Sequence, residues 1–222
     1  MFSFEAWWQI LTTKLPVFFQ GVGTTVELAL CTAIFGTLLG IVVALLRMSR
    51  VKLLKVLAGA YIEFLRGTPL LVQVLIVFYG LPQMGVKLPR MTAGTVALVI
   101  NSAAYMAEIV RSGIQAIDGG QTEASRSLGM NGAQTMIYII LPQAIKNILP
   151  AIGNEFISII KESSILYTIG IYELTYQANK LASTNFRYLE TLTISALIYF
   201  VLTFNASRLL GMLERRMRRG DR

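Results

Sequence analysis

Polar and charged residues interrupt three otherwise apolar segments of the chain, each near the middle of its segment. Inside a membrane-spanning segment such groups are costly, and they usually face a partner or a water-filled cavity. Recognition of a small zwitterion needs donors for its anionic group and acceptors for its ammonium group. We therefore interpret nine residues as a candidate substrate site: Gly67, Thr68, Leu70, Asn101, Tyr105, Ser158, Lys161, Glu162 and Ser164.

Glu162 is the first candidate for an acceptor that faces a cationic group, and Ser158 lies on the same helical face. An additional acid in a cavity favours a basic substrate, although Lys161 directly beside Glu162 weakens this inference. The alternative is that the charges pair with one another, as Glu63 with Arg66 or Lys161 with Glu162, and only hold the helices together.

Neutral groups complete the candidate site. Asn101, Tyr105 and Ser164 can each supply hydrogen bonds. Pro69 interrupts the helical hydrogen-bond pattern, and Gly67 permits close approach of another backbone, so backbone groups become available to a ligand in this segment.

The composition indicates an integral membrane protein. Of 222 residues, 55% are hydrophobic and only 14% are charged, whereas a soluble domain usually carries about 25% charged residues. The absence of histidine excludes histidine-based zinc sites and proton relays, and one cysteine excludes an internal disulfide. The sequence contains no phosphate-binding loop pattern and no acidic cluster typical of a catalytic site. We therefore predict no catalytic residue, no metal site and no cofactor in this chain.

Five apolar segments are long enough to span a bilayer, which predicts an all-α transmembrane domain over residues 1–222. The predicted spans cover residues 17–46, 56–80, 92–117, 148–169 and 189–213. Four basic residues and no acid link the first two spans, and five arginines follow the fifth. Because the more basic side of a membrane protein is cytoplasmic, we expect the N-terminus outside and the C-terminus inside. The net charge of +8 is therefore attributed to topology and not to nucleic-acid binding.

A polar segment, GGQTEASRSLG (residues 119–129), separates the third and fourth spans on the predicted cytoplasmic side. Gly119-Gly120 is expected to end the third span, and residues 121–129 are expected to form a short helix. Gly129 suits the left-handed residue that ends a helix. These observations fit either a solvated connector or a helix that docks on a cytoplasmic partner.

The arrangement Glu123-Ala124, Gly129 and Ile140-Leu141-Pro142 resembles the EAA loop of permease subunits of bacterial ABC importers. Ser125 replaces the usual second alanine, a small-for-small change that still permits close packing. The resemblance implies that this loop is a coupling helix that docks into a cleft on an ATP-binding subunit. The implied coupling residues are Glu123, Ala124, Ser125, Arg126, Leu128 and Gly129.

Three further stretches resemble the polar amino acid subfamily of these permeases: residues 64–73 (FLRGTPLLVQ), residues 101–111 (NSAAYMAEIVR) and residues 161–166 (KESSIL). The resemblance covers about residues 17–215, nearly the whole chain. The resemblance implies a multi-pass protein of the bacterial cytoplasmic membrane with a second permease subunit, identical or paralogous. It also implies two ATPase subunits that bind ATP and Mg²⁺, and an external solute-binding protein.

The predicted function is import of polar amino acids, with arginine, lysine or histidine favoured over glutamine and other neutral substrates. A stand-alone ion-coupled carrier or channel is the alternative, in which Glu162, Lys161 or Arg66 serves as an ion site. That alternative gives no role to the GGQTEASRSLG segment. A membrane scaffold is a third reading, and it does not require polar groups inside the spans.

Overall fold

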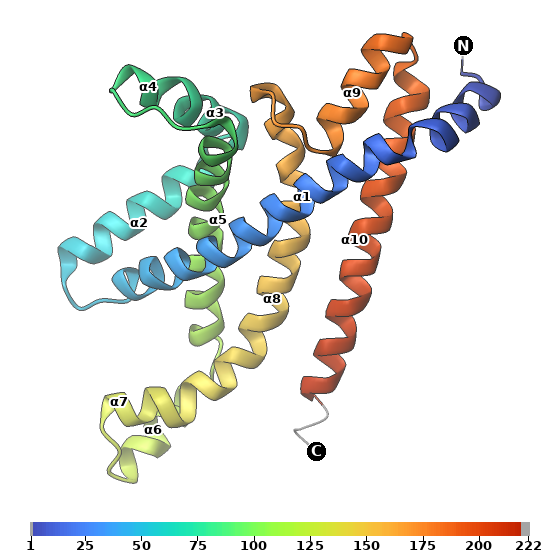
Figure 1. Ribbon diagram of the computed structural model, residues 1–222. Coiled ribbons are helices and arrows are strands. Elements are labelled where there is room, and N and C mark those ends of the chain that lie inside the picture. Colours follow the sequence, from blue (N-terminus) through green and yellow to red (C-terminus); the bar gives the residue numbers. More distant parts are fainter. Residues whose placement is uncertain (1, 219–222) are drawn as a thin grey trace.

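The computed structural model describes residues 2–218, which form helices and contain no strand. Three long helices run roughly side by side between the two ends of the molecule: α5 (Arg90–Gln115), α8 (Leu141–Glu162) and α10 (Tyr188–Arg218) (Figure 1). The longest helix, α1 (Phe4–Arg47), crosses them obliquely. The predicted all-α architecture is confirmed for the described residues.

Within residues 2–218, four helical stretches are long and apolar enough to cross a membrane, namely α1, α5, the run Gly132–Ile169 and the run Tyr188–Met217. A fifth crossing is present if a bent pair of helices, Lys52–Gly67 and Leu70–Gln83, counts as one span. Three of these stretches extend beyond the predicted spans, whereas α5 begins and ends two residues earlier than the predicted span 92–117. Helix α1 in particular begins at Phe4 and continues through Pro16.

The predicted interruption near Pro69 divides the second apolar segment into α2 (Lys52–Gly67) and α3 (Leu70–Leu75). The angle between Lys52–Gly67 and the helical stretch Leu70–Gln83, which begins with α3, is 108°. Pro69 lacks an amide hydrogen and caps the start of α3 with an extended backbone. The segment continues as a π-helix, η1 (Ile76–Gly80), and a single turn, α4 (Leu81–Gln83). The proline thus produces a sharp bend between α2 and α3, called the elbow below, in place of one straight helix.

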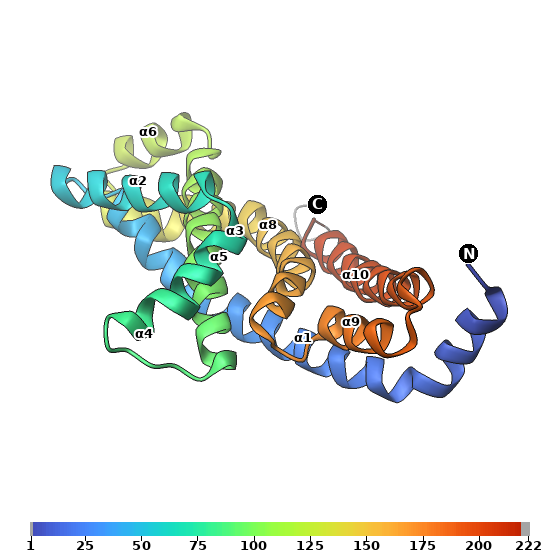
Figure 2. The ribbon, with the colours of Figure 1, turned by 90° about the horizontal axis from the view of Figure 1, so that it is seen from above.

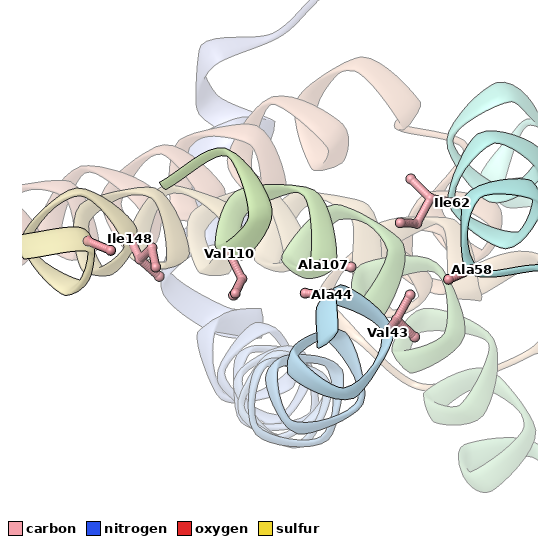
Figure 3. Close-up of a cluster of buried hydrophobic side chains, with 8 residues drawn as sticks. Val43, Ala44, Ala58, Ile62, Ala107, Val110 and Ile148 are labelled. Atoms are coloured by element: carbon pink, nitrogen blue, oxygen red, sulfur yellow. The ribbon is translucent and has the colours of Figure 1, made fainter. Parts of the chain in front are cut away.

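Small residues let α1 and α5 pack closely. A β-carbon added at Gly36 would lie 2.9 Å from the Ser102 hydroxyl, and one at Gly40 would lie 3.0 Å from the Ala103 carbonyl oxygen. Nearby, Val43 and Ala44 of α1 form a buried cluster with side chains from α2, α5 and α8 (Figure 3). The small-residue motif of α1 therefore serves a contact within the chain.

At the end of the molecule beyond α5, the chain forms α6 (Gly119–Ser127), α7 (Gly132–Gln134) and the π-helix η2 (Thr135–Ile140) before entering α8. The prediction that Gly119-Gly120 breaks the helix is wrong, because both glycines form the first turn of α6. The break lies before them, where the Asp118 carboxylate accepts a hydrogen bond from Gly120 N at 2.8 Å. Gly129, with φ of +85°, has the expected left-handed conformation.

After α8 the chain tightens into the 3₁₀-helix η3 (Ser163–Ile169) and turns at Gly170. It then forms a helix that the sequence reading did not predict, α9 (Leu174–Asn185), which lies between α1 and α10 (Figure 2). Glu173 is the N-cap of helix α9, and its carboxylate accepts hydrogen bonds from Tyr176 N at 2.7 Å and Thr175 N at 2.8 Å.

Candidate functional site

A hydrogen-bonded cluster holds the elbow between α2 and α3. The Gln73 amide donates to the Leu65 carbonyl at 2.8 Å and to the Thr68 hydroxyl at 2.8 Å. The buried Asn101 amide of α5 donates to Gln73 Oε1 at 2.9 Å. Pro69 has no N–H to donate to the Leu65 carbonyl, and the Gln73 amide supplies a donor in its place. Thr68 and Asn101 therefore already have hydrogen-bond partners within the protein.

The other predicted residues of the elbow differ in exposure. Gly67 is exposed, with no atom within 4 Å of a β-carbon added there, whereas Leu70 packs against a buried apolar cluster. Arg66 is exposed, and its guanidinium carbon lies 5.3 Å from the centre of the half-buried Tyr105 ring. Cation–π stacking thus places a positive charge beside Tyr105.

Helix α8 presents Glu155, Ser158 and Glu162 at spacings of three and four residues, so the three side chains share one helical face. All three are half-buried. Glu155 was not among the predicted site residues.

The predicted residues Lys161 and Ser164 lie in a different place, since both line a pocket of about 400 Å³ between α8–η3, α9 and α10. Thr175 and Tyr199 also line this pocket, and sequence reasoning identified neither. Lys161 is exposed and has no ion pair among the described residues. The structure therefore divides the predicted set among three places: the bend between α2 and α3 with the facing part of α5, the acidic face of α8, and a pocket with one basic residue.

The pocket adjoins a buried carboxylate. Glu173 is fully buried and accepts a hydrogen bond from the Tyr199 hydroxyl at 2.8 Å, in addition to its two backbone donors on α9. Burial raises the pKa of the Glu173 carboxyl group from 4.5 to about 7, although the hydrogen bonds from Thr175, Tyr199 and Tyr176 act in the opposite direction. This carboxylate joins α9 to α10.

The alternative pairs considered from the sequence do not form in the described part of the chain. Glu63 lies 3.7 Å from Arg47, not beside Arg66, and Lys161 forms no ion pair with Glu162. One acid–base pair does form near the end of α5, where Arg111 Nε donates to Glu108 at 3.0 Å. No group of acidic, histidine or cysteine side chains suited to a metal ion occurs within residues 2–218.

The six predicted coupling residues lie on or directly after α6. Ser125 is buried, and its hydroxyl hydrogen-bonds with Thr135 of η2 at 3.0 Å, which fixes α6 against the start of the next span. Glu123, Ala124, Arg126, Leu128 and Gly129 are exposed. Leu128 is 84% exposed, which is unusual for a large apolar side chain unless it meets a partner.

Sequence reasoning missed several residues that contribute to these arrangements, among them Glu155, Gln73, Thr175 and Tyr199. The spacing of Glu155 to Ser158 and Glu162 was a visible signal, because residues three, four and seven positions apart share one face of a helix. Gln73 and Tyr199 gave no such signal, since their partners come from distant parts of the chain.

Curated relatives match nearly the whole chain. The arginine transport system permease protein ArtQ of Bacillus subtilis (strain 168) is 40% identical over 209 residues, covering 94% of this chain and 95% of the relative. The glutamine transport system permease protein GlnP of Escherichia coli (strain K12) is 34% identical over 213 residues, covering 95% of this chain and 97% of the relative.

A solved structure, described as the crystal structure of an amino acid ABC transporter with histidines, superimposes with a TM-score of 0.92 at 50% identity. The match covers 97% of this chain and 99% of that chain. The family model for the binding-protein-dependent transport system inner membrane component matches residues 36–219. The resemblance to ABC importer permeases is thereby confirmed, and as a membrane component the chain is not the ATPase of its system. This multi-pass membrane protein belongs to the family of binding-protein-dependent transport system inner membrane components.

Proposed function

We propose that this chain is the translocation subunit of an ATP-driven importer of polar amino acids in the bacterial cytoplasmic membrane. It pairs with a second permease subunit, identical or paralogous, and with two ATP-binding subunits that hold ATP and Mg²⁺. An external solute-binding protein delivers the substrate. Support comes from the family membership and from relatives named as amino acid permeases over almost the full length of the chain.

In this assembly α6 is the coupling helix, with the N-terminus of the chain outside and the C-terminus inside. The exposed Leu128, next to the left-handed Gly129, supports docking of α6 in a cleft on an ATPase subunit. Closure of the ATPases on ATP moves the two coupling helices together and opens the pathway outward. Hydrolysis returns it to the inward-facing state, as in alternating access by rocking of rigid bundles.

The proposed substrate is a basic amino acid, and the acidic face of α8 is the observation that carries this choice. Glu155 and Glu162 place two carboxyl groups on one half-buried face, where a cationic side chain is the complementary ligand. A relative named for arginine and a structure described with histidines support the same choice, whereas a relative named for glutamine represents the competing one.

Replacement of Glu162 or Glu155 by Gln tests the proposal. The permease is reconstituted with its ATPase subunits and binding protein in proteoliposomes, and uptake of labelled arginine and glutamine is measured with and without ATP. Loss of a buried charge partner costs about 2–5 kcal/mol, so we expect arginine uptake efficiency to fall by at least about 30-fold. Glutamine uptake should change less, and the exposed Glu5→Gln variant serves as the matched control.

An equal loss for both amino acids, or no loss for either, contradicts the basic-substrate proposal. Uptake by the permease alone, driven by an ion gradient without ATP, contradicts the importer proposal itself. The two parts of the proposal therefore fail by different measurements.

A further inference from the structure

A second pocket, of about 430 Å³, opens on the flank of α1 and is separate from the polar face of α8. Three elements line it: Thr24 and Glu27 from α1, Arg90 and Met91 from the start of α5, and residues 170–172 after η3. None of these residues belongs to the predicted substrate site or to α6. The pocket brings one acid and one base to the same place.

The two charged side chains in this pocket have no compensating partner among the described residues of the protein. Glu27 and Arg90 are both exposed, and within residues 2–218 neither forms a hydrogen bond or an ion pair. Unpaired charges along membrane-spanning helices are costly unless water, a partner or a ligand compensates them. The complementary ligand carries an anion for Arg90 and an ammonium group for Glu27, which describes a zwitterion.

The backbone after η3 leaves space for the guanidinium group of Arg90. Gly170 turns the chain with φ of +76°, and a β-carbon added there would lie 2.8 Å from Arg90 Nη1. A side chain at this position would therefore displace the guanidinium group. The next residue but one, Tyr172, packs edge-on against Tyr176, with ring centres 4.7 Å apart, and forms an aromatic wall of the pocket.

The pocket lies at the level where spans begin and end. Arg90 is the first residue of the α5 span, and Gly170 directly follows the span that ends at Ile169. Figure 1 shows that α5 begins, and the run from α8 into η3 ends, at the end of the molecule opposite α6. Arginine and tyrosine are typical of this interfacial level. Here phospholipid headgroups surround a membrane protein, whereas the deeper part of α1 faces acyl chains.

An apolar stripe leads away from the pocket along α1. Ile34 and Leu38 follow Glu27 at steps of seven and four residues, so all three side chains share one face of the helix. The two apolar side chains are 57% and 59% exposed. A ligand with a zwitterionic head and apolar chains matches both the charged pocket and this stripe.

We propose that this pocket binds the headgroup of an aminophospholipid in the leaflet opposite α6, with the phosphate at Arg90 and the primary ammonium group at Glu27. Its acyl chains lie along the exposed stripe of α1. A free amino acid shares the zwitterionic head but has no part that contacts the stripe. The pocket therefore anchors α1, α5 and the turn at Gly170 to a lipid.

The test uses the purified transporter complex, titrated with phosphatidylethanolamine, phosphatidylcholine or phosphatidylglycerol, with native mass spectrometry to count retained lipids. Wild-type complex should prefer phosphatidylethanolamine over the other two lipids. Glu27→Gln should reduce this preference about fivefold, the scale of one exposed ion pair. Arg90→Gln should reduce retention of all three lipids.

Matched controls change the same charge types outside the pocket. Lys87→Gln removes a nearby exposed base, and Glu5→Gln removes an exposed acid of α1. Both should retain the wild-type lipid preference. Unchanged retention in Glu27→Gln and Arg90→Gln overturns the proposal. It is also overturned if these variants lose binding of labelled arginine or glutamine in lipid-free detergent while lipid retention stays the same, because the pocket then serves a free amino acid.

Discussion

At the scale of single residues, burial and hydrogen bonding decide which polar groups can meet a ligand. Asn101 was a candidate ligand, yet its amide nitrogen lies 2.9 Å from Gln73 Oε1 and holds the elbow of the broken span. Glu155 and Glu162, by contrast, have no hydrogen-bond partner among the described residues, and both side chains are partly exposed. A side chain without a protein partner is therefore the stronger candidate.

Glu173 should make stability depend on pH. Its folded-state pKa of about 7 lies above the ordinary value of 4.5, so its stabilising contribution is complete below about pH 4.5 and is lost as the pH rises through 7. We expect the thermal midpoint of the detergent-purified protein to fall between pH 5 and pH 8. This fall should be smaller in Glu173→Gln, because the amide does not ionise.

Circular dichroism across this pH range measures the effect, with Glu5→Gln as the exposed control that keeps the wild-type slope. The substitution replaces one carboxyl oxygen by an amide nitrogen, which cannot accept a hydrogen bond, so Glu173→Gln is also expected to be less stable at pH 5. Parallel curves for the wild type and Glu173→Gln would show that another group sets the pH dependence.

At the scale of elements, close contact between α1 and α5 depends on glycine. Gly40→Ala introduces a β-carbon 3.0 Å from the Ala103 carbonyl oxygen and 3.1 Å from Ala107 N, and neither backbone atom can move without shifting α5. Overpacking of this kind costs about 1–3 kcal/mol. We expect a lower thermal midpoint, measured by circular dichroism. Gly23→Ala in the same helix meets no atom within 4 Å and should leave the midpoint unchanged or slightly raised.

If both substitutions lower the midpoint equally, helix packing at Gly40 is not the cause. The course of α1 also depends on packing that local sequence signals miss. Pro16 does not end α1, although Figure 2 shows the helix bending in its N-terminal part. Proline removes one hydrogen bond, and packing of this part against α9 and α10 keeps the helix continuous.

At the scale of the whole molecule, the number of spans depends on whether the elbow of α2 and α3 crosses the membrane. Val51 precedes α2 and is 54% exposed, and Met84 follows α4 and is 80% exposed. In a Cys31→Ser background, Val51→Cys and Met84→Cys each provide one reactive thiol. If the bent pair is one span, a membrane-impermeant maleimide should label Met84→Cys from outside and Val51→Cys only in inverted vesicles.

Labelling of both positions from the same side would instead identify a re-entrant loop and four spans. Labelling of Val51→Cys alone from outside would reverse the proposed orientation. The experiment therefore tests the span count and the orientation by separate outcomes, and a functional uptake assay confirms that each variant is folded.

The sequence by itself determined the membrane class, the helical architecture, the family and the left-handed Gly129 that follows a short helix. These features follow from hydropathy, charge and local motifs, all of which can be recognised in short stretches of the sequence. Only the tertiary structure decided which polar groups are already satisfied and which remain open. Gln73 meets Asn101 from 28 residues away, and Thr25 meets the start of α9 from 149 residues away. Such partners depend on how helices pack, which no local pattern encodes.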